Sequence, residues 1–266
     1  MNNGTGSNVS HPEPLIVSVS GLRGIVGKSL TDDVAAAYAC SFIETLPAGP
    51  IVVGRDGRES GPALKKIISK AITASGRDVL DCDTASTPTV GVAVVENNAA
   101  GGIQISASHN PAPYNGLKLF SEKGRVLPAT EGDAVRLRFE AMRRTPPKTQ
   151  KECEPGNIHS IESTLPHLEK VLAIIDVDAI RRVNPKVWID CGRGAGSRLA
   201  RPLLEALGCE VTVVGEPPDG QFEHEPEPTA ENLIELLPQI PAAGADIGFF
   251  QDPDADLLAI ADGTGR

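Results

Sequence analysis

The stretch Gly102-Ile-Gln-Ile-Ser-Ala-Ser-His-Asn-Pro111 runs from a strand-like alternation into a polar loop. Apolar side chains at every second position predict a buried strand over Gly102–Ser106. Pro111 has no amide hydrogen, so we expect a constrained turn that holds the polar side chains of residues 108–110 outward. Open α/β sheets bind ligands at the carboxyl ends of their strands, which makes this loop a candidate site.

A second polar loop, Asp252-Pro-Asp-Ala-Asp256, follows the apolar run that ends at Phe250. Alternate carboxylates on an extended loop share one face, and ligand sets made only of oxygen favour Mg²⁺ over Zn²⁺. A calcium EF-hand is excluded, because it needs Gly at loop position 6 and Glu at position 12, where the chain has Leu257 and Gly263. A solvated acidic turn remains the alternative, although three adjacent carboxylates repel one another without a cation.

The two loops together indicate phosphoryl transfer. A serine hydroxyl such as that of Ser108 is a poor nucleophile unless a neighbour accepts its proton or neutralises the phosphate. Lys118, ten residues later across a tight return, could do either. An ordinary polar hairpin is the alternative interpretation of the serine loop. We predict a phosphotransfer enzyme with a serine acceptor and a divalent cation site.

The order of elements indicates an α/β fold, in which strand-like runs alternate with amphipathic helical stretches. The 266 residues exceed the ~150 usual for one domain. We predict two consecutive α/β domains with mixed, mostly parallel sheets flanked by helices. The predicted ranges are a disordered N-terminus at 1–14, a serine-loop domain at 15–150, a Pro-rich linker at 145–156 and an acidic-loop domain at 157–266.

Three further predictions are local: a loop, a helix and the exposure of the histidines. Glycines punctuate Ser20–Gly27, which predicts a loop, and a helix is expected from Ala230 to about Leu237. Four histidines other than His109 have no partner at ligand spacing, so we expect them at the surface. They are His11, His159, His167 and His224.

Charge and composition exclude several classes of protein. A net charge of −10 argues against a nucleic-acid surface, which needs clustered cations. The five cysteines are odd in number and contain no CxxC pair, so neither a disulfide framework nor a zinc site is indicated. No stretch approaches the ~18 apolar residues of a membrane span. We therefore expect a cytoplasmic protein with no membrane or nucleic-acid partner.

Gly192-Arg-Gly-Ala-Gly196 suggests a different class of function. The loop follows a predicted strand, and Glu216 lies twenty residues beyond it, as in dinucleotide-binding folds. The pattern is imperfect, since Ser197 stands where the third glycine belongs. A tight strand-to-helix turn is the preferred interpretation, and a nucleotide-binding domain remains the alternative.

Several segments in one order across nearly the whole chain resemble the α-D-phosphohexomutases, the family of phosphoglucomutase, phosphomannomutase and phosphoglucosamine mutase. The matching segments are Ser20-Gly-Leu-Arg-Gly-Ile-Val-Gly27, Gly54-Arg-Asp-Gly-Arg-Glu-Ser-Gly61, Thr87-Pro88, Ile105-Ser-Ala-Ser-His-Asn-Pro111, Asn115-Gly-Leu-Lys118 and Asp252-Pro-Asp-Ala-Asp256. The resemblance implies the first two of four phosphohexomutase domains.

The resemblance also implies a mechanism and a set of site residues. Phosphate would pass from a phosphoserine to a small phosphosugar through a bisphosphate that reorients, with Mg²⁺ and a glucose 1,6-bisphosphate-type activator as cofactors. The implied metal ligands are Ser108, Asp252, Asp254 and Asp256. The implied catalytic residues are Ser108, Lys118 as general acid/base, and Arg23 and His109 as stabilising groups. Phosphate-binding or supporting residues would be Arg55, Arg58, Asn110 and Asn115. The resemblance leaves the hexose and the oligomeric state open.

Two departures from the family pattern affect the expected activity. The family usually has Arg after the third Asp, where this chain has Leu257, and Leu cannot replace a bidentate phosphate contact. The family's third and fourth domains, which grip the substrate, have no counterpart here, so the sequence predicts the N-terminal part of a mutase with little activity of its own. A catalytically inert Mg²⁺-binding or phosphosugar-binding protein of two domains is the alternative.

Overall fold

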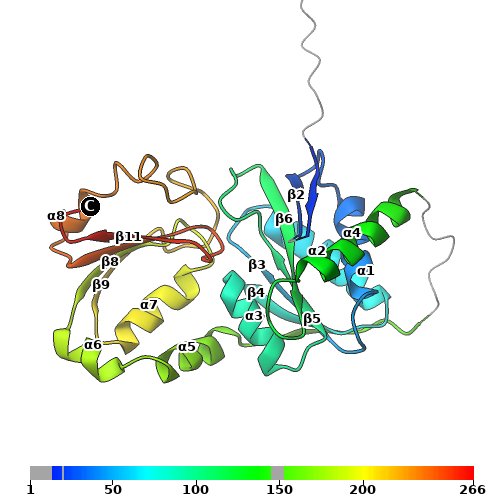
Figure 1. The fold of residues 1–266 in the computed structure, drawn as a ribbon, viewed down its shortest axis with the longest axis horizontal. Helices are drawn as coiled ribbons and strands as arrows, with labels where there is room; N and C mark the ends of the chain where they lie inside the picture. The colour runs from blue at the N-terminus through cyan, green and yellow to red at the C-terminus, as the bar shows by residue number, and fades with distance from the viewer. Residues whose placement is uncertain (1–13, 20, 145–152) are drawn as a thin grey trace, which may run out of the picture.

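A computed structural model describes residues 14–19, 21–144 and 153–266. The N-terminus predicted to be disordered lies, except for Pro14, outside the described residues, and so does most of the predicted linker. Figure 1 shows two α/β lobes side by side, with the segment before α5 (Thr164–Ala173) crossing from one to the other. In the described part of the chain, no helix is long and apolar enough to cross a membrane.

The first lobe is built on a seven-stranded sheet in the order β1-β2-β6-β5-β3-β4-β7. Its strands are β1 (Ile16–Ser18), β2 (Gly21–Ile25), β3 (Ile51–Arg55), β4 (Val79–Thr84), β5 (Gly101–Ile105), β6 (Tyr114–Ser121) and β7 (Ile158–Ser160). The half from β5 to β7 is parallel and the half from β1 to β5 is antiparallel. The sheet is therefore mixed, as predicted, but only half of its pairings are parallel.

Helices cover both faces of this sheet because its central strands are apolar on both sides. In β3, Ile51 and Val53 pack in the cluster that includes α1 (Asp32–Ile43), α2 (Gly61–Ala74) and α4 (Ala129–Arg144), and Val52 faces the opposite cluster with α3 (Thr87–Glu96). Two capping hydroxyls fix helix starts: the side chain of Thr31 accepts from Val34 N in α1, and Ser86 accepts from Thr89 N in α3.

The second lobe has a four-stranded sheet in the order β11-β10-β8-β9. Its elements are α5, α6 (Val177–Val183), β8 (Lys186–Asp190), α7 (Ser197–Ala206), β9 (Glu210–Val214), α8 (Gln239–Ala242), β10 (Ile247–Gln251) and β11 (Leu258–Asp262). One face packs against α7 through Ala200 and Leu204. On the other face, Trp188 and Phe250 lie with ring centroids 5.3 Å apart and pack against Leu233 and Ile240. The two lobes confirm the α/β fold with mixed sheets.

Two of the local predictions, those for residues 20–27 and 230–237, are wrong, and the prediction of surface histidines fails for His167, which is half-buried with Nδ1 2.9 Å from Thr89 Oγ1. The glycine-rich stretch from Ser20 is strand β2 over Gly21–Ile25, because it pairs antiparallel with β6, and a Cβ at Gly116 would lie 2.3 Å from Leu22 O. The expected helix at 230–237 is a run of turns, in which the amides of Leu236 and Leu237 both donate to the carbonyl oxygen of Leu233. These hydrogen bonds span both three and four residues, which is irregular for an α-helix, and the short helix α8 comes directly after the turns.

Strand β7 has no counterpart in the sequence prediction. Its three residues are all exposed, so they carry no burial pattern. It pairs parallel with β4 and so belongs to the first sheet, although residues 158–160 fall in the range predicted for the second domain. The boundary positions stay a prediction.

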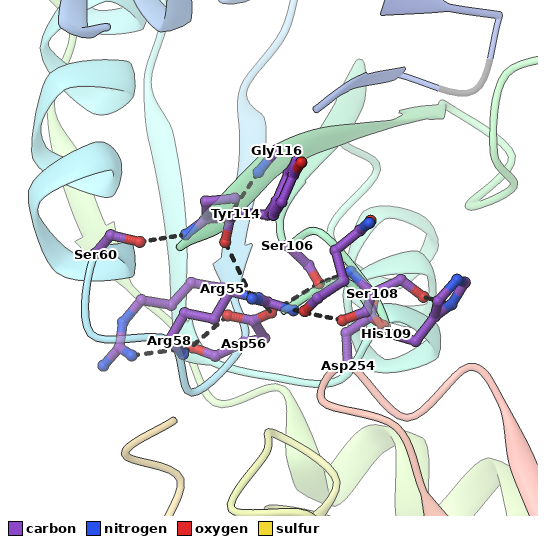
Figure 2. A network of polar contacts seen from close by, with 12 residues as sticks. Arg55, Asp56, Arg58, Ser60, Ser106, Ser108, His109, Tyr114, Gly116 and Asp254 are labelled. Carbon is purple, nitrogen blue, oxygen red and sulfur yellow. Dashed lines mark hydrogen bonds and ion pairs between the residues drawn. The ribbon is translucent and has the colours of Figure 1, made fainter. Parts of the chain in front are cut away.

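The fold brings the two polar loops together. The serine loop joins β5 to β6, and the acidic loop joins β10 to β11. Each leaves its sheet at the carboxyl end of a strand, and the two ends face each other at the junction of the lobes (Figure 2).

Candidate active site

The serine hairpin, residues 106–114, has a strained backbone at its centre. Ser108 adopts a φ of +52°, the left-handed region that non-glycine residues seldom enter. Its amide donates to Ser106 Oγ over 2.8 Å, and that hydroxyl donates to Asp56 Oδ2 over 2.7 Å. A buried polar chain therefore holds Ser108 in a conformation that the free chain would disfavour.

Arg58 supports the hairpin from below (Figure 2). Its side chain is buried, and its guanidinium donates to the carbonyl oxygens of Ser108 and Asn110, each over 2.6 Å, and of Pro111 and Tyr114 over 2.9 and 3.0 Å. The remaining N–H, on Nε, donates to Asp56 Oδ2 over 3.0 Å. All five donors of the guanidinium are thus used inside the protein. Arg58 has the supporting role among those predicted for it, and keeps no donor for a substrate phosphate.

Asp56 was missed by the sequence prediction. It follows β3 at the strand's carboxyl end and is fully buried. Burial raises its pKa to about 6, although Arg58 and the Ser106 hydroxyl favour the ionised form. The only local signal was its place between two arginines in a turn, which does not distinguish a buried carboxylate from an exposed one.

The acidic loop presents its carboxylates to the hairpin. Asp252 and Asp254 are 0% exposed and Asp256 is exposed, yet one ligand atom from each lies within 4.8 Å of the others. Asp252 Oδ1 accepts from the amides of Asp256 and Leu257, each over 3.1 Å. Its Oδ2 accepts from Ser108 Oγ over 2.8 Å. Residues 144 positions apart in the sequence are therefore in direct contact.

Lys118 lies among these carboxylates. From β6, its Nζ donates to Asp254 Oδ2 over 2.6 Å and to Asp256 Oδ2 over 2.5 Å. Burial opposes the charged ammonium, but the attraction of Asp254 and Asp256 outweighs it and raises the pKa of Lys118. Lys118 therefore carries a proton at the site.

Thr87, at the start of α3, also holds the acidic loop. Its hydroxyl donates to Asp254 Oδ2, and its amide donates to the Asp254 carbonyl over 2.8 Å. The sequence prediction gave Thr87 no role, because nothing in the pair Thr87-Pro88 shows that its partner lies 167 positions away.

The site fits a divalent cation. Burial, and then the charge of Asp254, raises the pKa of Asp252 to about 7. Burial also works against ionised Asp254, yet Lys118 outweighs it and lowers the pKa of Asp254. Among the described residues, Asp254 Oδ1 is a buried oxygen without a hydrogen-bond partner. A buried carboxylate oxygen without a donor, beside two further carboxylates, suits a hard cation such as Mg²⁺.

The other predicted site residues divide into two groups. His109 Nδ1 lies 3.4 Å from Ser108 Oγ, and Arg23 Nη1 donates over 3.1 Å to Oδ1 of Asn110, two positions further along the hairpin. Asn115 is buried and donates to Ser60 Oγ over 2.9 Å, so it supports the hairpin. The Arg55 guanidinium lies 3.2 Å from Asp83, and its Nη1 also donates to the Asp56 carbonyl oxygen over 3.1 Å, so Arg55 holds the turn beside the site.

Two further sequence features can be placed. Leu257 contributes its amide to Asp252, and the residue is 42% exposed. In the glycine loop 192–196, Ala195 N donates to Pro253 O over 2.8 Å, and a Cβ on Gly194 would lie 2.4 Å from that oxygen. The acidic loop thus fills the space beside these glycines, which favours the tight strand-to-helix turn over a dinucleotide site.

Comparison with known proteins agrees with this geometry. The family description "Phosphoglucomutase/phosphomannomutase, alpha/beta/alpha domain I" matches residues 15–145, and the description of domain II matches residues 166–265. Among curated proteins, a phosphoglucomutase/phosphomannomutase of Thermococcus kodakarensis is 37% identical over 254 residues, covering 92% of this chain and 55% of that protein. A probable phosphoglucosamine mutase of Methanothermobacter thermautotrophicus is 33% identical, covering 96% of this chain and 56% of that protein.

Solved structures show the same likeness. A phosphoglucomutase/phosphomannomutase family protein from Burkholderia thailandensis superimposes with a TM-score of 0.80 at 28% identity, covering 94% of this chain and 55% of that one. A putative phosphomannomutase from Thermus thermophilus gives 0.82 at 25% identity, covering 95% of this chain and 58% of that one. This chain spans about half the length of these relatives. The chain belongs to the phosphoglucomutase/phosphomannomutase family.

Proposed function

We propose that the chain is the phosphoserine-bearing and metal-binding part of a phosphohexomutase. Such an enzyme interconverts hexose 1-phosphate and hexose 6-phosphate through a bisphosphorylated sugar. The observation that supports the proposal most is the contact of Ser108 Oγ with Asp252 Oδ2 over 2.8 Å, inside a cluster that also holds Asp254, Asp256 and Lys118. A nucleophilic hydroxyl, a proton acceptor, a cation site and a proton donor lie together.

The chain's own residues account for the transfer of one phosphoryl group. Ser108 Oγ attacks phosphorus, and its proton passes to Asp252 Oδ2, which already accepts its hydrogen bond. As the bond from phosphorus to the sugar oxygen breaks, protonated Lys118 supplies a proton to that oxygen. In the return step the sugar hydroxyl attacks phosphoserine, and the same protons move back.

The remaining polar groups position the reacting atoms. Ser108, Asp252, Asp254 and Asp256 would hold Mg²⁺, which when bound offsets the negative charge of the phosphoryl group. His109 lies beside the serine and Arg23 contacts Asn110 of the same hairpin, and both would stabilise phosphoryl or substrate oxygens. Arg58 and Asn115 keep the hairpin in place, so that the oxygen of Ser108 is presented in one orientation.

We assign substrate binding to a part of the protein outside this chain. The chain spans about half of its relatives' length, and we infer that groups contacting the sugar and its second phosphate belong to the other half. We therefore expect this chain alone to accept a phosphoryl group from a glucose 1,6-bisphosphate-type donor, with little mutase turnover. The substrate is a small phosphosugar, and its identity as glucose, mannose or glucosamine depends on groups outside this chain.

Mass spectrometry can test the assignment. The protein is incubated with Mg²⁺ and glucose 1,6-bisphosphate, and the phosphorylated residue is located by peptide fragmentation. Phosphate on Ser108, lost in Ser108→Ala and retained in Ser121→Ala, supports the proposal; Ser121 is buried in the same sheet but away from the hairpin. Unmodified protein, or phosphate on Ser106 alone, contradicts it.

One alternative function is supported by a specific observation. The absence of an arginine after Asp256, where exposed Leu257 stands, favours a catalytically inert protein that binds Mg²⁺ or a phosphosugar. Calorimetry with Mg²⁺ and with glucose 6-phosphate distinguishes the two. Binding without any phosphorylation of Ser108 favours the inert protein.

A further inference from the structure

A buried ion pair of the second lobe lies outside the proposed chemistry. Asp190 ends β8 at the strand's carboxyl end, and its side chain is 5% exposed. Asp190 Oδ1 accepts from Gly192 N over 2.8 Å, and Oδ2 accepts from His224 Nε2 over 2.6 Å. The side chain of His224 is 18% exposed, so the prediction of a surface histidine is wrong for this residue.

The partners of His224 determine its protonation state. Nε2 faces the Asp190 carboxylate, and Nδ1 lies 2.8 Å from the carbonyl oxygen of Glu225. Both partners are acceptors, so only the doubly protonated ring can donate to each of them. The hydrogen bond to Asp190 is the largest cause of a raised pKa for His224, and burial opposes it less strongly. His224 is therefore an imidazolium that joins Asp190 to the backbone of its own segment.

His224 anchors the end of the segment 215–225, whose earlier residues bind Arg193, and the segment packs on the turn that contains Arg58. A Cβ on Gly220 would lie 2.7 Å from Arg58 Cα and 2.8 Å from Gly57 O. The guanidinium carbon of Arg58 lies 5.1 Å from the ring centroid of Phe222. The segment therefore packs directly on the turn at Gly220 and Phe222.

The same turn holds the nucleophile. Arg58 donates to four carbonyl oxygens of the serine hairpin, including that of Ser108 itself. A continuous set of contacts thus runs from Asp190 through His224 and the segment 215–225 to Arg58 and then to Ser108. We propose that His224 is a positioning residue: as an imidazolium bound to Asp190, it clamps the segment 215–225 on Arg58 and so holds the serine hairpin in its reactive position.

The charges around His224 determine how the clamp depends on pH. Besides Asp190, Glu223 lies next to it on the segment, and Glu223 and Asp219 both bind Arg193, which follows β8. Arg193 offsets one of these two carboxylates, and the charge of Glu223 also raises the pKa of His224, with the hydrogen bond to Asp190 as the larger cause. Because the pKa of His224 is raised in the folded protein, the stabilisation is complete below its unfolded pKa and is lost as pH rises through the folded pKa. The clamp therefore loosens when pH rises above the folded pKa of His224.

Hydrogen exchange tests the clamp without assuming any activity. Amide exchange is measured across residues 106–116 in the wild type, His224→Gln and Asp190→Asn, with His159→Gln as the control. His159 is also near an aspartate, but its side chain is 53% exposed and lies on β7. At about pH 6, exchange in 106–116 should be about 10-fold faster in the two clamp variants and unchanged in the control. Exchange in α1 shows whether a variant remains folded, and equal exchange at 106–116 in all four folded proteins overturns the inference.

A rate measurement tests the positioning role and depends on the proposed function. The initial rate of Ser108 phosphorylation is followed by intact mass from about pH 6 to about pH 9. The ratio of the wild-type rate to the His224→Gln rate should be about 10 at the acid end and should approach 1 as His224 loses its proton. A ratio that is constant over pH, or equal to that of His159→Gln, refutes the positioning role. Absence of phosphorylation in the wild type refutes the proposed function, while the exchange comparison still tests the clamp.

Discussion

Replacing Arg58 by Lys should destabilise the first lobe, and the same change at Arg55 should not. The guanidinium of Arg58 uses all five of its donors, four on hairpin carbonyls and one on Asp56. An ammonium has three donors, so Arg58→Lys removes at least two of these five buried hydrogen bonds. Arg55, three positions earlier, pairs with the half-exposed carboxylate of Asp83 and makes a matched control.

The size of the effect follows from burial. A hydrogen bond to a charged group contributes about 1.5–3 kcal/mol, and an acceptor left buried without a partner costs a similar amount. Arg58 is 2% exposed, so little water can replace the lost donors. We expect Arg58→Lys to reduce the free energy of unfolding by about 3–5 kcal/mol, the range for breaking a buried pair. The pair of Arg55 with Asp83 is partly exposed, with side chains 14% and 54% exposed, so Arg55→Lys should reduce the free energy of unfolding by less than Arg58→Lys does.

Urea unfolding with two probes resolves the lobes. Trp188, the sole tryptophan in the sequence, reports the second lobe by fluorescence, and far-ultraviolet circular dichroism reports both. Arg58→Lys should lower the midpoint of the circular dichroism transition at an unchanged slope, with a smaller change in fluorescence. Equal midpoints for Arg58→Lys and Arg55→Lys would refute the assignment of Arg58 as the support of the hairpin.

Three further predictions concern the acidic loop. Without metal, the pKa of Asp252 is raised to about 7, so its ionisation destabilises the fold as pH rises from about 4 to about 7. In urea titrations, Asp252→Asn should weaken this pH dependence of the unfolding free energy. Added Mg²⁺ should counteract the destabilisation in the wild type only. Lys118→Met should slow Ser108 phosphorylation about 100-fold yet strengthen Mg²⁺ binding by calorimetry, because Nζ no longer competes for Asp254; weaker binding would contradict that competition. Leu257→Arg should speed phosphoryl transfer to Ser108 or prolong its retention, whereas Leu258→Arg, also exposed, should do neither; identical behaviour of the two variants would separate position 257 from the site.

The sequence predicted those elements whose signal is local. Buried runs such as Ile51–Val53 alternate between two apolar faces, and the prolines and glycines after each strand mark the turns. The two polar loops were recognised for the same reason, because Ser108 and the aspartates follow apolar strands directly. Their contact needed a resemblance to a known family, since no local pattern specifies a partner 144 positions away.

The misses have one physical cause, which is dependence on distant partners. Strand β2 is a strand because β6 pairs with it, and its glycines allow a close approach that periodicity does not report. Asp56 and Thr87 acquire roles through partners 50 and 167 positions away. Arg55 and Arg58 look alike in the sequence, yet burial makes one a support of the hairpin and leaves the other beside Asp83.

The contact between Ser108 and Asp252 crosses the boundary between the lobes. A shift of about 1 Å between groups that react can cost about 100-fold in rate. A chimaera that joins the first lobe of one relative to the second lobe of another would therefore contain both the serine and the aspartates. The distance between these groups would not be preserved. Recombination within this family should therefore preserve activity only when both lobes come from the same parent protein.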